Sequence, residues 1–457
     1  MEPQYKKRSA FSGKIGFVLS AAGASVGLGN IWRFPYLAAK YGGGIFLLIY
    51  ILLAFTFGYT MIVAETALGR MTKKSPVGAF AAFGKKGGLS FGGWINAIIP
   101  ILIVPYYSVI GGWVIRYLAD YVAGHGKELA TDGYFSSFIS NGASAEICFI
   151  IFTIFTLAII FAGVRNGVER VSKVMMPILV VLSVIIAGYS VTRPGALAGV
   201  KYFLVPNVAH FSWMTVVTAM GQMFYSLSIA MGILVTFGSY MRKDTSIEDS
   251  TRNVEIFDTA IAMMAGLMII PAVFAFSGGD PDTLQAGPSL MFITIPKVFA
   301  NMGFGTAVGI LFFVLVLFAA VTSSIALTES AVSTFEDELG WGRKKATVLT
   351  GVIMIALGTL SCLGYGPLDF VKIIGMQFLD FFDFLTNSVM MPIAALMTSL
   401  LVSRVIGVDK IEEEIRHGES AFRRKKIFVV MIKYLCPIFA LIILASSVAN
   451  AFGWIVM

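Results

Sequence analysis

The chain has 457 residues, of which 57% are hydrophobic and only 13% are charged, and its formal net charge is +8. A soluble chain of this size carries about 25% charged residues, so this composition excludes an ordinary soluble protein and indicates a polytopic membrane protein. Each apolar stretch is long enough for the ~20 residues that cross a bilayer. We identify eleven: 12–36, 42–70, 89–119, 145–163, 168–191, 213–240, 255–277, 304–335, 346–364, 371–403 and 427–452.

The first stretch is interrupted where a membrane helix should be regular. Residues 23–35 read Gly-Ala-Ser-Val-Gly-Leu-Gly-Asn-Ile-Trp-Arg-Phe-Pro. An unpaired backbone N–H or C=O is costly in hydrocarbon, so a break at that depth must be buried in protein or line a water-filled cavity. Its carbonyls can hold a cation and its N–H groups an anion. The segment therefore predicts a binding site.

The sixth stretch has a similar interruption at 221–232, where serines and glycines again lie in mid-membrane. Glycine is common in membrane helices, which is the alternative explanation. Two breaks five spans apart favour a transporter built from inverted repeats. We therefore expect one transmembrane domain over 1–457, with repeats at about 12–191 and 213–403 and an additional helix at about 427–452. The fold class is all-α, with helices 1 and 6 unwound.

Most of the basic residues lie at the N-terminus and in alternate connections, such as 70–86 and 404–426. This positive-inside pattern predicts a cytoplasmic N-terminus, and eleven spans then place the C-terminus outside. The positive charge is thus an orientation signal, and no nucleic-acid partner is expected. Cysteines at 148, 362 and 436 fall within spans and give no disulfide framework.

Ionisable residues within membrane spans are candidate functional groups. Asp258 is either a cation ligand or a helix-start residue at the membrane edge. Glu65 either accepts the N–H groups of the sixth-span break or lies near a helix end beside Arg70. The other such residues are Arg33, Glu329, Asp380 and Asp383.

Adjacent hydroxyl groups occur in the eighth span, at Thr322, Ser323 and Ser324. Such groups often bond the carbonyl four residues earlier, but hydroxyl and carbonyl oxygens are also ligands that a hard cation such as sodium prefers. The Tyr106-Tyr107 pair in the third span is either packing or a phenol that faces the site.

Seven short motifs occur in order along nearly the whole chain: Gly27-Leu28-Gly29-Asn30, Trp32-Arg33-Phe34-Pro35, Tyr106-Tyr107, Gly221-Gln222, Ser239-Tyr240, Thr322-Ser323-Ser324 and Glu336-Asp337-Glu338-Leu339. With these motifs the chain resembles the neurotransmitter:sodium symporter family, and especially its bacterial tyrosine and multi-hydrophobic amino acid transporters.

The resemblance implies two sodium sites and one substrate site. The first sodium would contact Ser25, Asn30, Ser226 and Asp258, and the second would contact Gly23, Val26, Ala319, Thr322 and Ser323. The substrate site would comprise Ser25, Leu28, Gly29, Ile103, Tyr107, Tyr225, Ser226, Ser228, Met231, Ser323 and Leu327. The substrate carboxylate would meet the amides of Leu28 and Gly29, the Tyr107 hydroxyl and the first sodium.

The resemblance also implies gates on both sides of the substrate. Arg33 with Asp383 would form the outer gate, and Arg8 with Asp337, near Tyr240, the inner one. The spacing from Gly167 to Pro177 resembles a family helix break in the fifth span, for which an ordinary proline kink is the alternative.

Two departures from relatives concern the substrate and chloride. Gly27 stands where amine transporters carry Asp, which favours a substrate with its own carboxylate. Asp258 stands where chloride-dependent members have Asn, so no chloride requirement is expected.

The sequence thus predicts a sodium-coupled symporter in the bacterial cell membrane. It would take up hydrophobic L-amino acids, aromatic ones in particular, by alternating access. Membrane lipid is the other expected partner, and the oligomeric state is left open. The alternatives are a proton-coupled transporter of the same fold, or a substrate sensor or channel. The sequence shows no enzyme constellation.

Overall fold

The structure is a computed structural model that describes residues 9–83, 89–278 and 287–455, and within these ranges it is all-helical, with two isolated bridges and no strand. Nine helical stretches in the described residues are long and apolar enough to cross a membrane, and a bent pair makes a tenth. These findings agree with the predicted all-α membrane protein. The predicted sixth span consists of two helices with a gap between them, so the count of eleven spans stays a prediction.

Several spans combine α-helical and π-helical turns. The helices of the first half are α1 (Lys14–Ser25), η1 (Gly29–Arg33), α2 (Phe34–Lys40), α3 (Gly44–Leu53), η2 (Ala54–Gly58), α4 (Tyr59–Thr72), α5 (Pro76–Phe83), α6 (Ser90–Val122), η3 (Glu128–Ala130), α7 (Tyr134–Ser140), α8 (Gly142–Phe161), η4 (Val164–Glu169), α9 (Arg170–Val191), α10 (Ala196–Leu204) and η5 (Val208–His210).

Those of the second half are α11 (Trp213–Ser226), α12 (Ile233–Tyr240), α13 (Ile247–Ser277), η7 (Leu290–Thr294), α14 (Ile295–Ala300), α15 (Gly305–Glu338), α16 (Arg343–Leu363), α17 (Phe378–Asp383), η8 (Phe384–Met390), α18 (Met391–Leu400), η9 (Leu401–Ile406), α19 (Val408–Arg416), α20 (Lys425–Val430), η10 (Met431–Leu435) and α21 (Cys436–Ala451).

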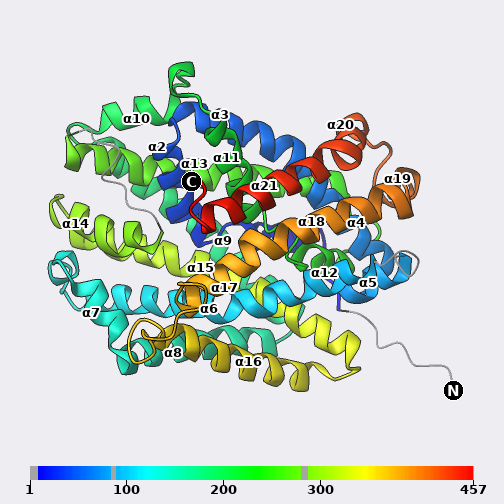
Figure 1. Cartoon of the computed structure of the whole chain (residues 1–457), viewed down its shortest axis with the longest axis horizontal. Coiled ribbons are helices and arrows are strands. Elements are labelled where there is room, and N and C mark those ends of the chain that lie inside the picture. The colour runs from blue at the N-terminus through cyan, green and yellow to red at the C-terminus, as the bar shows by residue number, and fades with distance from the viewer. Residues whose placement is uncertain (1–8, 84–88, 279–286, 456–457) are drawn as a thin grey trace.

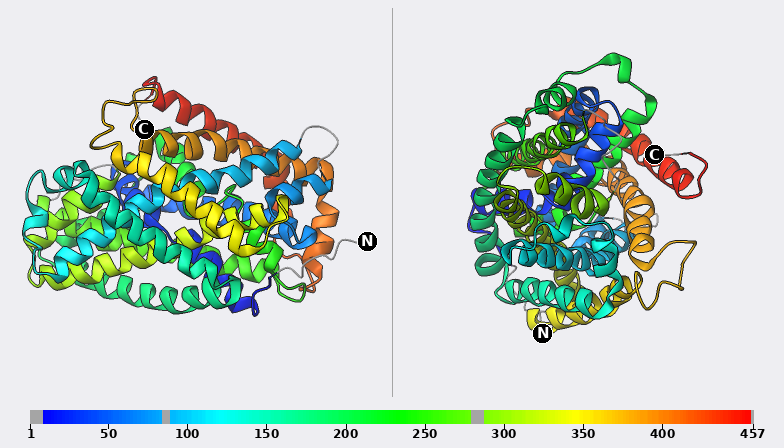
Figure 2. Two further views of the ribbon diagram at one scale, coloured as in Figure 1. Left: turned by 90° about the horizontal axis from the view of Figure 1, so that it is seen from below. Right: turned by 90° about the vertical axis from the view of Figure 1, so that its left-hand side faces the viewer.

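The long helices run side by side along the molecule. α3 and α10 lie along one edge and α8 and α16 along the opposite edge (Figure 1). A view along the long axis shows many of the helices nearly end-on (Figure 2). α15 packs against α6, and α1 packs against α9, α13 and α15. This arrangement surrounds the interrupted first span with protein, as a break in mid-membrane requires.

The seventh span starts earlier than the sequence predicted. α13 begins at Ile247 rather than near 255, with the Ser246 hydroxyl as its N-terminal cap. Asp258 therefore lies three turns inside a continuous helix and is fully buried. The interpretation of Asp258 as a helix-start residue at the membrane edge is wrong, because Ser246 already supplies the cap.

The fifth span is helical from Val164 to Val191 and continues through Pro177. In this conformation the Gly167–Pro177 segment is not unwound. The tenth span begins at Phe378 rather than near 371, because 364–377 forms turns and one isolated bridge.

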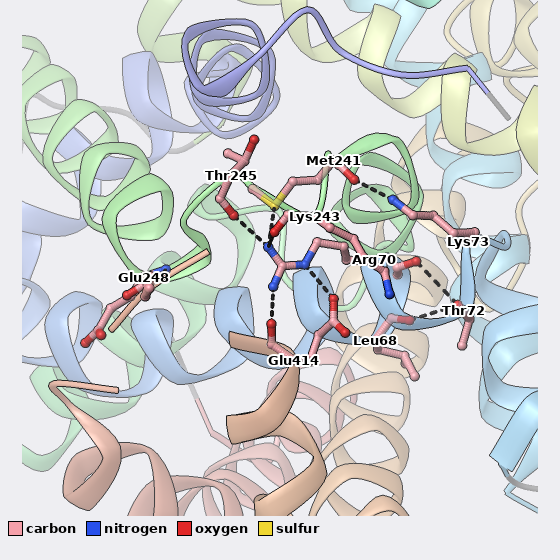
Figure 3. A network of polar contacts seen from close by, with 11 residues as sticks. Leu68, Arg70, Thr72, Lys73, Met241, Lys243, Thr245, Glu248 and Glu414 are labelled. Carbon is pink, nitrogen blue, oxygen red and sulfur yellow. Dashed lines mark hydrogen bonds and ion pairs between the residues drawn. The ribbon is translucent and has the colours of Figure 1, made fainter. Parts of the chain in front are cut away.

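Arg70 and its polar contacts, the Arg70 cluster, join three segments of the chain (Figure 3). The Arg70 side chain of α4 is fully buried, and its Nε lies 2.6 Å from a carboxylate oxygen of Glu414 on α19. One terminal nitrogen donates to the Thr245 carbonyl at 2.6 Å, and the other to the Glu414 carbonyl. A buried charge is tolerated only when it is paired and hydrogen-bonded, so this cluster ties α4 firmly to the segments around 245 and 414.

Candidate functional site

The first span is broken where its sequence predicted. α1 ends at Ser25 and the chain resumes as helix at Gly29, with a bend of 54° between the two parts. A side chain at Gly29 has no room, since its Cβ would lie 2.3 Å from the ring of Tyr225. The glycine thus allows an aromatic ring to lie directly over the broken backbone.

The sixth span is broken between α11 and α12. Within the gap, Ser228 and Ala230 have φ angles of 52° and 60°, and Gly232 has a φ of 70°. Positive φ is unfavourable for residues with a side chain and persists only where the surroundings hold it. Glu65 of α4 provides one such contact, because its buried carboxylate accepts the Ala230 N–H at 2.8 Å. This geometry favours the first of the two alternatives for Glu65.

The two breaks lie against each other and against α15. The Ser228 hydroxyl donates to the Ala24 carbonyl at 3.0 Å. The Ser323 hydroxyl of α15 lies within 3.1 Å of the same oxygen. Segments about 200 and 300 residues from the first break thus meet at one of its backbone groups.

A small cavity lies between the two breaks. All eleven residues expected to bind the substrate line it, together with Ala24, Gly27, Asn30 and Ile233. Its wall is largely apolar, and one polar end is formed by the Leu28 N–H, which donates to the Tyr107 hydroxyl at 3.2 Å. A Cβ at Gly27 would lie 2.8 Å from the Ser323 hydroxyl and 3.1 Å from that of Tyr107. The polar end therefore has space only because residue 27 is glycine.

A cluster of oxygen atoms adjoins the cavity around Asp258. The Asn30 amide donates to one of its carboxylate oxygens at 2.9 Å, and the Ser226 hydroxyl lies 2.8 and 3.0 Å from the two oxygens. The Tyr50 hydroxyl donates to the second oxygen at 2.8 Å. Three of the four residues expected at the first sodium site, Asn30, Ser226 and Asp258, are thus in contact, and Ser25 lines the adjoining cavity.

Tyr50 was not recognised from the sequence. It is a fully buried tyrosine of α3 in a long apolar stretch. The only available signal was a polar hydroxyl at mid-span, which needs a partner when buried. Its partner on α13 lies 208 residues away.

A second oxygen cluster lies between α1 and α15. The Ser323 hydroxyl is 3.2 Å from the Gly23 carbonyl and 3.5 Å from that of Val26. The Thr322 hydroxyl donates to the Phe318 carbonyl, four residues earlier, at 2.9 Å, which is the alternative contact for this hydroxyl, and it also lies 3.2 Å from the Ala319 carbonyl. A Cβ at Gly23 would be 3.1 Å from the Thr322 side chain. All five residues expected at the second sodium site are therefore together. Carbonyl and hydroxyl oxygens suit a hard cation.

The expected outer-gate residues line a second cavity of about 320 Å³. The Arg33 guanidinium lies 5.3 Å from the centre of the Tyr225 ring. Asp383 accepts hydrogen bonds from Tyr106 at 3.1 Å and from Asn387 at 2.6 Å. No ion pair within 4.0 Å joins Arg33 to Asp383 among the described residues, so a contact between them in this conformation would need a bridging water.

The opposite end of the site contains the expected inner-gate residues. The Tyr240 hydroxyl donates to Glu329 at 2.8 Å, and Glu329 forms an ion pair with Arg343 at 2.5 Å. Asp337 accepts the Ser75 N–H at 2.6 Å. Arg8 lies outside the described residues. Glu329, which the sequence flagged as an intramembrane charge, is thus paired.

Comparison with known proteins identifies the family. The sequence matches the sodium:neurotransmitter symporter family over residues 8–126 and 134–453. The chain belongs to the sodium:neurotransmitter symporter family. It is therefore a sodium-dependent, multi-pass membrane transporter rather than an enzyme, as the sequence predicted.

Relatives in this symporter family cover almost the whole chain. An uncharacterized sodium-dependent transporter of Bacillus subtilis, YhdH, is 34% identical over 97% of this chain and 98% of its own length. One from Haemophilus influenzae is 31% identical over 98% of this chain and 100% of its own length. The crystal structure of MhsT in complex with L-phenylalanine is similar with a TM-score of 0.87 and 34% identity, over 96% of this chain and 100% of that chain.

Proposed function

We propose that the protein takes up hydrophobic L-amino acids, aromatic ones in particular, together with sodium by alternating access. The observation that carries the proposal is the buried Asp258 carboxylate, held by Asn30 and Ser226 beside a mostly apolar cavity. A full negative charge in a dry site requires a positive partner. Sodium, which the symporter family transports, provides that charge.

The proposed substrate orientation follows from the cavity. The substrate carboxylate would lie at the polar end of the cavity and accept hydrogen bonds from the Leu28 N–H and the Tyr107 hydroxyl. In the present conformation the Leu28 N–H donates to the Tyr107 hydroxyl instead. An apolar side chain would then contact Ile103, Met231 and Leu327. Methionine adapts its shape to large groups. The MhsT complex with L-phenylalanine supports an aromatic substrate.

We propose two sodium ions per cycle and no requirement for chloride. The first ion would sit between Asp258 and the substrate carboxylate, so that each ligand raises the affinity of the other. The second would join α1 to α15 through the Gly23, Val26 and Ala319 carbonyls. Asp258 would supply next to the first ion the negative charge that a bound chloride would otherwise provide.

Alternating access requires that the two sides of the cavity open in turn. Arg33 and Asp383 would close the outer side through water in their shared cavity, with Tyr225 beneath them. Arg8 and Asp337, near Tyr240, would close the inner side. The proposed orientation has a cytoplasmic N-terminus and an external C-terminus in a bacterial cell membrane, with the two five-helix repeats on opposite sides of the site.

Uptake by proteoliposomes tests the proposal. Labelled L-phenylalanine should accumulate above its external concentration when an inward sodium gradient is imposed. Replacing sodium with choline should abolish accumulation, whereas uptake driven by a pH gradient in choline would favour proton coupling. Binding without accumulation would indicate a sensor, and equilibration without accumulation a channel.

A further inference from the structure

A buried carboxylate joins the start of α1 to the start of the fifth span. Glu169, the last residue of η4, is 1% exposed and accepts the Ser12 N–H at 2.9 Å. The Ser12 hydroxyl also donates to it. Lys173, one turn later on α9, donates to Glu169 at 2.5 Å and to the Ser12 hydroxyl at 3.0 Å. Ser12, Glu169 and Lys173 are thus linked by hydrogen bonds, and we call this group the Glu169 contact.

Close packing of α1 against this carboxylate depends on a glycine. A Cβ at Gly16 would lie 2.5 Å from the carboxyl carbon of Glu169 and from one of its oxygens. Farther along α1, a Cβ at Gly23 would lie 3.5 Å from the sulfur of Met176 on α9. α1 therefore follows the fifth span from the Glu169 contact to Gly23, which is a ligand of the proposed second sodium site.

α1 can separate from Glu169 without leaving a buried charge unpaired. Ser12 is exposed, so water can replace the partner of its N–H and its hydroxyl when α1 moves away. Glu169 keeps Lys173 as its ion-pair partner on its own helix, so separation leaves no unpaired buried charge. The Arg70–Glu414 pair lacks this property, because separating α4 from α19 would leave a fully buried guanidinium without its carboxylate.

We propose that Glu169 is an inner latch that holds the first half of α1 against the fifth span and releases it when the inner side of the transporter opens. The inference rests on the proposed transport cycle for the direction of that opening. Glu169 acts as a positioning residue, because it contacts α1 rather than substrate or ion. Its release frees the helix that carries Gly23, which would expose the second sodium site to the cytoplasm.

Cysteine accessibility tests the latch. In a background with Cys148, Cys362 and Cys436 changed to Ser, one probe is Ser20→Cys, on the buried part of α1. The other is Ser388→Cys, which lines the outer cavity. Modification rates with a soluble maleimide are measured with and without sodium for the parent protein, Glu169→Ala, Ser12→Ala and the conservative Glu169→Gln. Asp244→Ala is the control, since it removes a carboxylate from an exposed pair with Arg242.

The latch predicts opposite changes at the two probes. Glu169→Ala and Ser12→Ala should raise the rate at position 20 about three- to tenfold, the effect of one or two hydrogen bonds, and lower the rate at position 388. Glu169→Gln should have a smaller effect because its amide oxygen still accepts from Ser12. Asp244→Ala should change neither rate.

Two outcomes would overturn the latch. Unchanged rates in both Glu169→Ala and Ser12→Ala would show that the contact does not restrain α1. Rates that rise at both probes would show a loosened structure instead of a shifted equilibrium. If the parent protein's probes do not respond to sodium, the proposed function fails, whereas the comparison between variants at fixed ion composition still decides the latch.

Discussion

Asp258→Asn is the most informative single change, because it removes one charge and keeps the size of the side chain. Asp258 is fully buried and contacts Asn30, Ser226 and Tyr50. Exposed ion pairs contribute about 1 kcal/mol or less, whereas removing one partner of a buried pair costs about 3–5 kcal/mol. Burial makes the second figure the relevant one. A loss of about 3–5 kcal/mol corresponds to a sodium affinity roughly 10²- to 4 × 10³-fold weaker.

The assay is a sodium titration of thermal unfolding with purified protein at constant ionic strength. Unfolding temperature rises with sodium because a ligand that binds only the folded state stabilises it by RT ln(1+[L]/Kd). In sodium gluconate, Asp258→Asn should shift the half-effect concentration upward by about two orders of magnitude or more. In sodium chloride, part of the loss should be recovered, because chloride can supply the missing negative charge.

A matched control lies on the same helix. Asp249→Asn removes a carboxylate from the first turn of α13, where its side chain is 34% exposed. This variant should titrate like the parent protein in both salts. An Asp258→Asn titration within a few-fold of the parent in gluconate would refute the reasoning, as would a parent protein that needs chloride for sodium-dependent stabilisation.

Three further outcomes are expected. Thr322→Val with Ser323→Ala should abolish much of the sodium-dependent stabilisation while the protein still folds; unchanged sodium dependence of uptake would show that the second site is misplaced. Charge reversal of Arg33 or of Asp383 should abolish uptake, and exchanging the two should restore part of it; a single reversal with normal uptake would exclude the proposed outer gate. Gly27→Ala should weaken L-phenylalanine binding, measured by equilibrium binding, by about 1–3 kcal/mol because the added methyl group overpacks the polar end of the cavity; equal affinity would place the substrate elsewhere.

The breaks in spans 1 and 6 could be predicted from the sequence because the membrane leaves few options. Glycines and Asn30 interrupt the helix in mid-membrane, where no water can hydrogen-bond the freed backbone N–H and C=O groups. The broken segments therefore had to be buried in protein or line a cavity. The membrane constraint did not bring Asn30, Ser226 and Asp258 together. Only the family resemblance implied that they form one cluster, and in the structure they are in contact.

Residues whose partners depend on helix orientation could not be predicted. Tyr50 looks like any aromatic residue of an apolar helix until α3 is packed against α13. Glu65 had two open interpretations, and only the position of the sixth-span gap beside α4 favours one. The sequence did not indicate that Arg70 pairs with Glu414, because α19 lies many spans later in the chain. In each case a prediction would require knowing which helix faces pack together. The spacing of residues along a single helix does not provide that information.

The Arg70 cluster has a consequence for the synthesis of the chain. Arg70 precedes Glu414 by 344 residues. At a synthesis rate of about 5–20 residues per second, Glu414 is added roughly 20–70 s after Arg70. During that time α4 cannot take its final position without burying the Arg70 charge away from its carboxylate partner. Nascent chains halted before residue 414 should therefore hold this end of the bundle open to water, and the connector before the last helix should act as the closing step of assembly.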